Sequence, residues 1–300
     1  MPTMRSLELL KKLRRIELHT RKILNTSFVG EYKSTFKGTG MEFVDVREYL
    51  PGDDIRAIDW KVTARMARPY VKKFVEEREL TVILCVDASG SGYFGTRSQF
   101  KLEQSAQVAA TLAFSAVVNN DKVGLLFFTD RVEKFIPPRK GRQHVMRLVR
   151  DILLFQPEHG ATSPAAALEF VMHILKHWAI VFLISDFMGP GFAPETVRIP
   201  LGIAARRHDL VAIPIVDAAE QELPPAGLVD LEDAETGEIV TVNTSDQRLR
   251  QAYREHARGL ESRRDRLFKQ LSIDSIRLHT HEDFTPRLHK FFRLRARRFH

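Results

Sequence analysis

Four short runs of almost uninterrupted apolar residues dominate the hydrophobic pattern of the chain. They are residues 81–86 (TVILCV), 123–128 (VGLLFF), 179–184 (AIVFLI) and 210–216 (LVAIPIV). Strands of a parallel sheet have this composition when helices bury both of its faces. The four runs therefore predict neighbouring strands of one parallel sheet.

Segments with helical spacing of apolar residues separate these runs. They are residues 100–118, 142–154, 164–177 and 194–207. The alternation predicts an α/β fold, with a doubly wound, mostly parallel, Rossmann-like sheet and helices on both faces. Residues 132–136 follow residue 128 too closely for a crossover helix, so we expect them to form an antiparallel edge strand.

The N-terminal part of the chain lacks this alternation. Residues 6–24 place apolar side chains at helical spacing among charges, which predicts an amphipathic helix. The following stretch is rich in glycine and carboxylates and has no clean helical periodicity. We therefore expect residues 1–78 to form an N-terminal helix and extension, and residues 79–300 to form the α/β domain.

The C-terminal part predicts additions to the sheet. Residues 228–242 resemble a β-hairpin around Thr236-Gly237 and are expected as an insertion. A long charged helix should follow over residues 246–271, and then a strand at 275–279 that rejoins the sheet at its other edge. The pattern ends with a basic helix at 284–298.

Composition narrows the class of protein. No apolar run reaches the roughly 18–20 residues that a membrane span needs, and the first residues are charged and helical rather than those of a signal peptide. The single cysteine, Cys85, excludes an internal disulfide and a cysteine-based zinc site. These features together predict a cytoplasmic protein.

The net charge of +8 is concentrated at the two ends of the chain. Residues 246–300 hold 15 Lys and Arg against 7 Asp and Glu, and residues 1–24 hold 7 against 2. Basic ends can meet nucleic acid, an anionic surface or an acidic protein. In the last helix we expect Leu288, Phe291 and Phe292 to pack on the protein, with the arginines facing outward: Arg293, Arg295, Arg297 and Arg298.

Candidate ligands for a metal ion follow the predicted strands. Asp87, Ser89 and Ser91 come directly after the first apolar run, Asp186 follows the third, and Thr162 precedes a helix. Ligands of open α/β sheets bind beyond the carboxyl ends of the strands, where these residues should meet. Hydroxyl and carboxylate oxygens suit Mg²⁺, Mn²⁺ or Ca²⁺. The sequence therefore predicts a site for a divalent cation.

This pattern resembles the metal-ion-dependent adhesion site of von Willebrand factor A (VWA) domains. That site has Asp-x-Ser-x-Ser, then Thr, then Asp, which fall here on Asp87, Ser89, Ser91, Thr162 and Asp186. The resemblance implies a VWA-like domain that grips a protein partner through a bound ion. If only hydroxyls bind the ion directly, they do not neutralise its charge. The ion should then bind a carboxylate of a partner protein as well.

Further stretches resemble the domain of unknown function 58 family of VWA-like proteins. They include GTGMEFVDVREYLPGDDIRAIDWKVTAR, LISDF and RRHDLVAIPIVD. The resemblance implies association with a MoxR-type AAA+ ATPase and its client protein, as an adaptor or co-chaperone rather than an enzyme. Ser163-Pro164 stands where the pattern of the family has Asp-Leu.

Other interpretations of these residues remain open. A haloacid-dehalogenase-type phosphatase also places an aspartate after its first strand, but needs a second one where Ser89 stands. The basic ends leave a nucleic-acid or anionic-surface binder as the alternative function. Five carboxylates near Pro51-Gly52 could hold a second cation, but we expect them to pair with Arg47, Arg56 and Arg65, with Trp60 as a packing anchor. These carboxylates are Asp45, Glu48, Asp53, Asp54 and Asp59.

Overall fold

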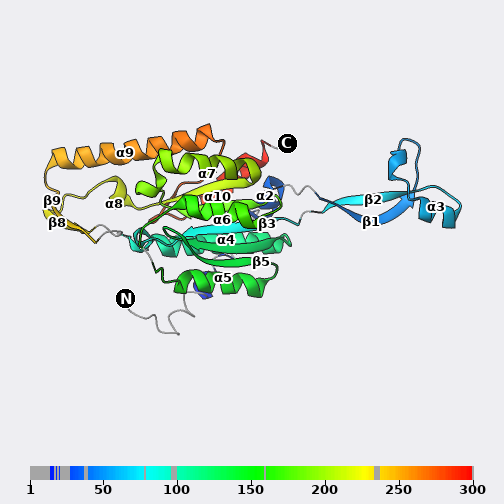
Figure 1. Cartoon of the computed structure of the whole chain (residues 1–300), viewed down its shortest axis with the longest axis horizontal. Coiled ribbons are helices and arrows are strands. Elements are labelled where there is room, and N and C mark those ends of the chain that lie inside the picture. Colours follow the sequence, from blue (N-terminus) through cyan, green and yellow to red (C-terminus); the bar gives the residue numbers. More distant parts are fainter. Residues whose placement is uncertain are drawn as a thin grey trace. The chain divides into compact units, whose positions relative to one another are not determined.

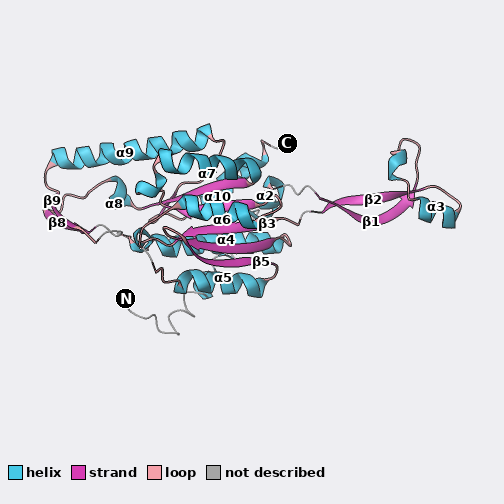
Figure 2. Ribbon diagram, in the orientation of Figure 1, coloured by secondary structure: helices cyan, strands magenta, loops and turns pink. Residues whose placement is uncertain are grey.

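The computed structural model describes residues 14–16, 18, 20, 28–36, 40–77, 79–95, 100–158, 160–232 and 237–298 (Figures 1 and 2). The chain divides into two compact units. One, which we call the body, is Met1–Thr35 with Thr81–His300, and the other, which we call the arm, is Phe36–Leu80. This division differs from the expected 1–78 and 79–300, because the N-terminal helical segment groups with the body.

A seven-stranded sheet forms the centre of the body, and its strand order is β10-β7-β6-β3-β4-β5, with β11 also paired to β7. The strands are β3 (Thr81–Asp87), β4 (Lys122–Phe128), β5 (Val132–Arg139), β6 (Ile180–Ser185), β7 (Asp209–Val216), β10 (Asp274–Ser275) and β11 (Leu278–His279). All neighbours are parallel except β4 and β5. Strand β3 is central, and nearly every side chain of β3 and β6 is buried.

Helices cover both faces of this sheet (Figure 2). The described α-helices of the body are α2 (Phe28–Thr35), α4 (Lys101–Val118), α5 (Arg142–Leu154), α6 (Pro164–Ile174), α7 (Pro194–Arg207), α8 (Ala218–Gln221), α9 (Gln247–Gln270) and α10 (Thr285–Ala296). The apolar sides of α6 and α7 and the end of α9 pack on one face, in a cluster with Ile83 and Leu183. Helix α4 packs on the sheet with α5 and α2 against it, and α10 packs on α2. Among the described helices, none is both long and apolar enough to span a membrane.

The predicted doubly wound α/β fold is confirmed, with differences at its edges. Strand β5 is the antiparallel edge strand expected at residues 132–136. The strand expected at 275–279 is split into β10 and β11, which both pair in parallel with β7. The predicted hairpin is present as β8 (Leu228–Glu232) and β9 (Ile239–Asn243). Of the predicted helix 6–24, the described residues are helical, and the rest lies outside the described part.

The last helix packs as predicted, but one of its arginines does not face outward. Leu288 and Phe292 are fully buried, and the ring of Phe292 meets Tyr32 of α2 edge-on. Arg295 is also buried, because its guanidinium forms an ion pair with Asp209 at the start of β7. Residue 295 follows Leu288 and Phe292 at a helical spacing of seven and three, so the sequence places it on the packed side. The prediction for Arg295 was therefore wrong.

The arm is an antiparallel ribbon of β1 (Gly40–Glu48) and β2 (Tyr70–Glu77) joined by η1 (Ile55–Ala57) and α3 (Trp60–Met66). Its carboxylates have structural roles. Asp53 pairs with Arg47 at 2.7 Å, while the side chains of Asp54 and Asp59 cap η1 and α3. Trp60 is 68% exposed, so the expectation that it anchors packing was wrong.

Loss of the Arg295 guanidinium should destabilise the body. Replacing it by glutamine leaves Asp209 without its buried cation, and breaking such a pair costs about 3–5 kcal/mol. Arg295→Gln should therefore lower the free energy of unfolding by that amount in urea titrations. Arg293→Gln, on the exposed side of the same helix, should change it by less than about 0.5 kcal/mol. Equal effects of the two substitutions would contradict the role of the buried pair.

Candidate functional site

The structure brings the five predicted ligands together at the carboxyl edge of the sheet. Asp87 ends β3, and Ser89 and Ser91 lie in the turn that follows, which includes η2 (Gly90–Tyr93). Thr162 precedes α6, and Asp186 follows β6. The site forms at this edge because parallel strands end side by side.

The carboxylate of Asp87 organises this edge. Its Oδ2 accepts hydrogen bonds from the hydroxyls of Thr162 at 3.0 Å and Ser185 at 2.6 Å. Its Oδ1 accepts from the backbone N–H of Ser89 at 3.0 Å. The Ser185 contact follows from the parallel register, because Val86 lies opposite Ile184 and the next residues are therefore neighbours. Asp87 thus ties the ends of β3 and β6 to the loop before α6.

The loops at this edge approach each other very closely. The backbone N–H of Gly90 donates to the carbonyl of Gly160 at 3.0 Å. A Cβ on Gly191, in η3 (Pro190–Phe192), would lie 2.1 Å from the carbonyl oxygen of Thr162. Only glycine fits there, because such a distance is a steric clash. The Thr162 loop and the segment after β6 are therefore packed backbone against backbone.

Asp186 occupies a tight turn next to a buried lysine. Its Oδ1 accepts from the backbone N–H of Met188 at 3.0 Å, and Phe187 between them has a left-handed φ of 58°. Its Oδ2 accepts from Lys101 Nζ at 2.6 Å. Lys101 begins α4, is 3% exposed, and also donates to Oε1 of Glu220 in α8.

Burial and neighbouring charges shift the pKa values of the site. Burial, with the charge of Asp186, raises the pKa of Asp87 to about 6, against the hydrogen bonds from Ser185 and Ser89. Burial alone would also raise the pKa of Asp186, but the Lys101 ammonium holds it below the ordinary value. Burial alone would lower the pKa of Lys101, and the carboxylates of Asp186 and Glu220 outweigh this and raise it. Asp186 and Lys101 are therefore an ionised pair at neutral pH.

The residues fit a small, hard cation. The side-chain oxygens of Ser89 and Ser91 are 3.1 Å apart, and adjacent ligands of an octahedral ion at about 2.1 Å lie about 3.0 Å apart. The void that these serines share with Asp87, Lys101 and Asp186 measures about 10 Å³, roughly the space of one water-sized particle. Among the described residues, no three His, Cys, Asp or Glu side chains are grouped for a metal ion, so the set depends on hydroxyl ligands.

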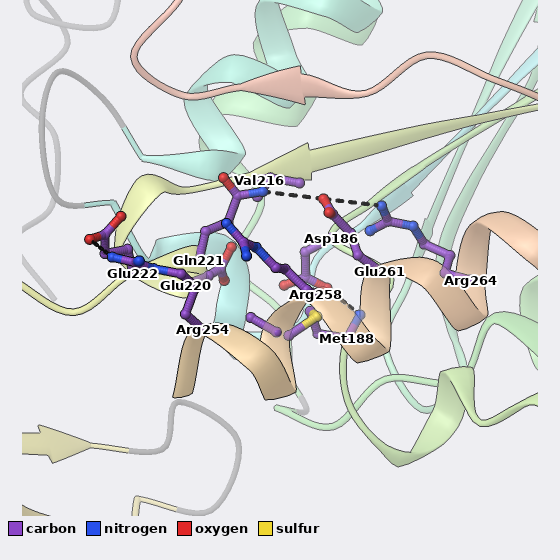
Figure 3. A pocket seen from close by; sticks show the side chains of 11 residues that line it. Asp186, Met188, Val216, Glu220, Gln221, Glu222, Arg254, Arg258, Glu261 and Arg264 are labelled. Atoms are coloured by element: carbon purple, nitrogen blue, oxygen red, sulfur yellow. Dashed lines mark hydrogen bonds and ion pairs between the residues drawn. The ribbon is translucent and has the colours of Figure 1, made fainter. Parts of the chain in front are cut away.

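A pocket of about 190 Å³ adjoins this site and shares Asp186 with it (Figure 3). Glu220 lines it from α8, and Figure 3 shows side chains of α9 along it, among them Arg254, Arg258 and Glu261. Arg254 pairs with Glu222 in the same lining. A ligand in this pocket would therefore contact positive and negative side chains of α9. It would also contact the carboxylate of Asp186 beside the candidate ion site.

Three residues of the site were not predicted from the sequence. Ser185 could have been noticed, because it directly precedes Asp186 at the end of an apolar strand. Lys101 and Glu220 carry no such signal, since 85 and 34 positions in sequence separate them from Asp186. Only the fold shows that α4 and α8 both begin near this edge of the sheet.

Comparisons with known proteins concern most of the chain. A family model described as a protein of unknown function, DUF58, matches residues 45–263. An uncharacterized protein of Mycobacterium bovis is 31% identical over 287 residues, which cover 95% of this chain and 89% of the relative. An uncharacterized protein of Mycobacterium avium is 29% identical over 172 residues, which cover 54% of this chain and 94% of the relative.

Solved structures align at low sequence identity. An aerotolerance-related membrane protein from Bacteroides fragilis is 13% identical, with a TM-score of 0.48, over 73% of this chain and 99% of its own. A von Willebrand factor type A protein from Catenulispora acidiphila is 11% identical, with a TM-score of 0.41, over 76% and 44%. Likenesses at this level give no information about a bound ligand.

The raised pKa of Asp87 gives the metal-free protein a specific pH dependence. The pKa of an aspartate in an unfolded chain is about 3.9. Between about pH 4 and 6, Asp87 is therefore protonated in the folded state and ionised in the unfolded state. Stability from this group is complete below that window and is lost as the pH rises through it. Relative to Asp87→Asn, the wild type should lose about 2–3 kcal/mol of unfolding free energy between pH 4 and 7. Urea unfolding with a chelator measures this, and a pH-independent difference would contradict it.

Proposed function

Since this chain belongs to the family described as protein of unknown function DUF58, we propose that its body is a metal-dependent protein-interaction module without catalytic activity of its own. In this proposal a divalent cation, Mg²⁺ or alternatively Mn²⁺ or Ca²⁺, binds at the carboxyl edge of the sheet. The module serves as an adaptor or co-chaperone of a MoxR-type AAA+ ATPase.

One observation carries the proposal: four of the five predicted ligands, Asp87, Ser89, Ser91 and Asp186, line one void of about 10 Å³. Ser89 and Ser91 present hydroxyls at the spacing of adjacent ligands, and Thr162 approaches from another loop to within 3.0 Å of Asp87. Such a set agrees with the adhesion-site pattern of VWA domains that the sequence resembles. It lacks the paired aspartates of the phosphatase alternative, because Ser89 stands at the second position.

The roles of the residues follow from their chemistry. The hydroxyls of Ser89, Ser91 and Thr162 would hold the ion, and the carboxylates of Asp87 and Asp186 would neutralise it and fix those hydroxyls. The bound ion would offer an open coordination position to a carboxylate of the partner. The neighbouring pocket along α9 is placed to receive side chains that flank that carboxylate.

Removing two hydroxyls tests the metal site with little damage to the fold. Ser89→Ala with Ser91→Ala keeps the backbone N–H that binds Asp87, so the edge of the sheet should remain intact. We expect Mn²⁺ affinity by calorimetry to fall at least about 100-fold, because two direct ligands are lost. Circular dichroism should remain unchanged.

Ser163→Ala is the matched control. Ser163 lies beside Thr162, but its side chain makes no capping hydrogen bond at the start of α6. This variant should bind Mn²⁺ like the wild type. Unaltered affinity in the Ser89 and Ser91 double variant would refute the proposed site.

Partner binding should depend on the same ligands. A MoxR-type ATPase from the same organism should bind the wild type in the presence of Mg²⁺, and chelation or the double serine variant should remove this binding. The reason is that the partner's carboxylate would lose the cation that it coordinates. Size-exclusion chromatography of the mixed proteins measures the complex, with Ser163→Ala as the control. A complex that survives both treatments would show that the ATPase contacts another surface.

Exposed arginines along α9 support an alternative function. Four of them are exposed: Arg248, Arg258, Arg263 and Arg266. A surface of this kind could bind nucleic acid or another polyanion, and such binding weakens steeply as salt increases. Binding to DNA or RNA that is unaffected by the double serine variant would favour this alternative.

A further inference from the structure

The candidate cation site already contains a positive charge. Lys101 is 3% exposed, and its Nζ lies 2.6 Å from Oδ2 of Asp186. Its side chain lines the same small void as Asp87 and the two serines. The ammonium of Lys101 therefore lies next to the position of any cation that Asp186 would help to hold.

The negative charge of this region is balanced only when both the ammonium of Lys101 and a divalent ion are counted. Asp87, Asp186 and Glu220 are three buried or largely buried carboxylates, and Lys101 bonds to two of them. A divalent ion and an ammonium repel each other strongly when they share one carboxylate in a region of low dielectric constant. A divalent ion at the serines would therefore compete with the ammonium for Asp186.

Glu220 gives the ammonium another acceptor. Its Oε1 accepts from Lys101, while its Oε2 accepts the backbone N–H of Asp217 at 2.9 Å and completes the cap of α8. The capped helix fixes this carboxylate in place, so Lys101 stays paired after it releases Asp186. A lysine side chain has enough rotatable bonds for this shift without movement of the backbone.

We propose that Lys101 is a built-in competitor of the divalent cation, which neutralises Asp186 in the metal-free protein and withdraws to Glu220 when the ion binds. The proposal rests on the metal site of the proposed function and adds what sets its affinity. Lys101 acts as a positioning residue, since it holds the carboxylate of Asp186 rather than the ion.

Calorimetry with Mn²⁺ on the full chain tests this competition. Lys101→Met should bind Mn²⁺ about tenfold or more tightly than the wild type, because Asp186 no longer has an internal cation. Lys101→Arg keeps the charge and should not show this gain. Lys122→Met is the control for net charge, because Lys122 is exposed at the amino end of β4, opposite the site. This variant should bind Mn²⁺ with the affinity of the wild type.

Two measurements keep the test decisive if Lys101→Met folds poorly. Lys101→Met with Glu220→Gln removes one charge of each sign, and should show the same gain. In the wild type, the NMR signal of the Lys101 Cε–Nζ group, assigned through Lys101→Arg, should shift on addition of Mg²⁺ while that of Lys122 does not.

The outcomes separate this inference from the function on which it rests. If the double serine variant loses Mn²⁺ binding but Lys101→Met gains none, or the Lys101 signal stays fixed at saturating Mg²⁺, the competition is refuted and the metal site stands. If neither the wild type nor Lys101→Met binds Mn²⁺, both proposals fail. Binding by Lys101→Met alone would show that the ammonium does not withdraw, which refutes the withdrawal to Glu220 and the metal-dependent function of the wild type.

Discussion

The buried carboxylate of Asp87 accepts hydrogen bonds from Thr162, Ser185 and the backbone of Ser89, and so joins the loop after β3, the end of β6 and the loop before α6. A buried carboxylate is costly unless its oxygens are satisfied, and these donors satisfy both of them. The arrangement of every other group at the edge depends on this bond set. The serines, the threonine and Asp186 can face one another only while these two loops and the end of β6 are held together.

The remaining charge at this edge is balanced by residues far apart in the sequence. Asp186 is paired with Lys101 from α4, which is paired in turn with Glu220 from α8. These contacts connect the candidate ion site to the pocket along α9, since Asp186 lines both and Glu220 lines the pocket. A change in the ion site would therefore alter the charge that a ligand in the pocket meets.

Much of the sheet, and the edge at which the five candidate residues lie, could be predicted because their signals are local. Each buried strand is a short apolar run, and each candidate ligand except Thr162 directly follows such a run. The features that could not be predicted depend on tertiary pairing. Helical spacing places Arg295 on the packed side of α10, but only the fold shows that Asp209 lies across from it. Lys101 reaches the site because α4 starts beside Asp186. Propensity and spacing describe single segments, so they contain no information about such pairs.

The arm begins and ends at neighbouring points, since Gly40 of β1 lies opposite Glu77 of β2 in their antiparallel ladder. Because the two ends of this segment are paired, the order of the strands in the sheet of the body does not depend on the length or sequence of the segment. Its outer residues include exposed apolar side chains such as Leu50, Ile55 and Trp60. A substitution among these side chains would therefore change the surface that the arm presents, while the order of the sheet strands in the body would stay the same.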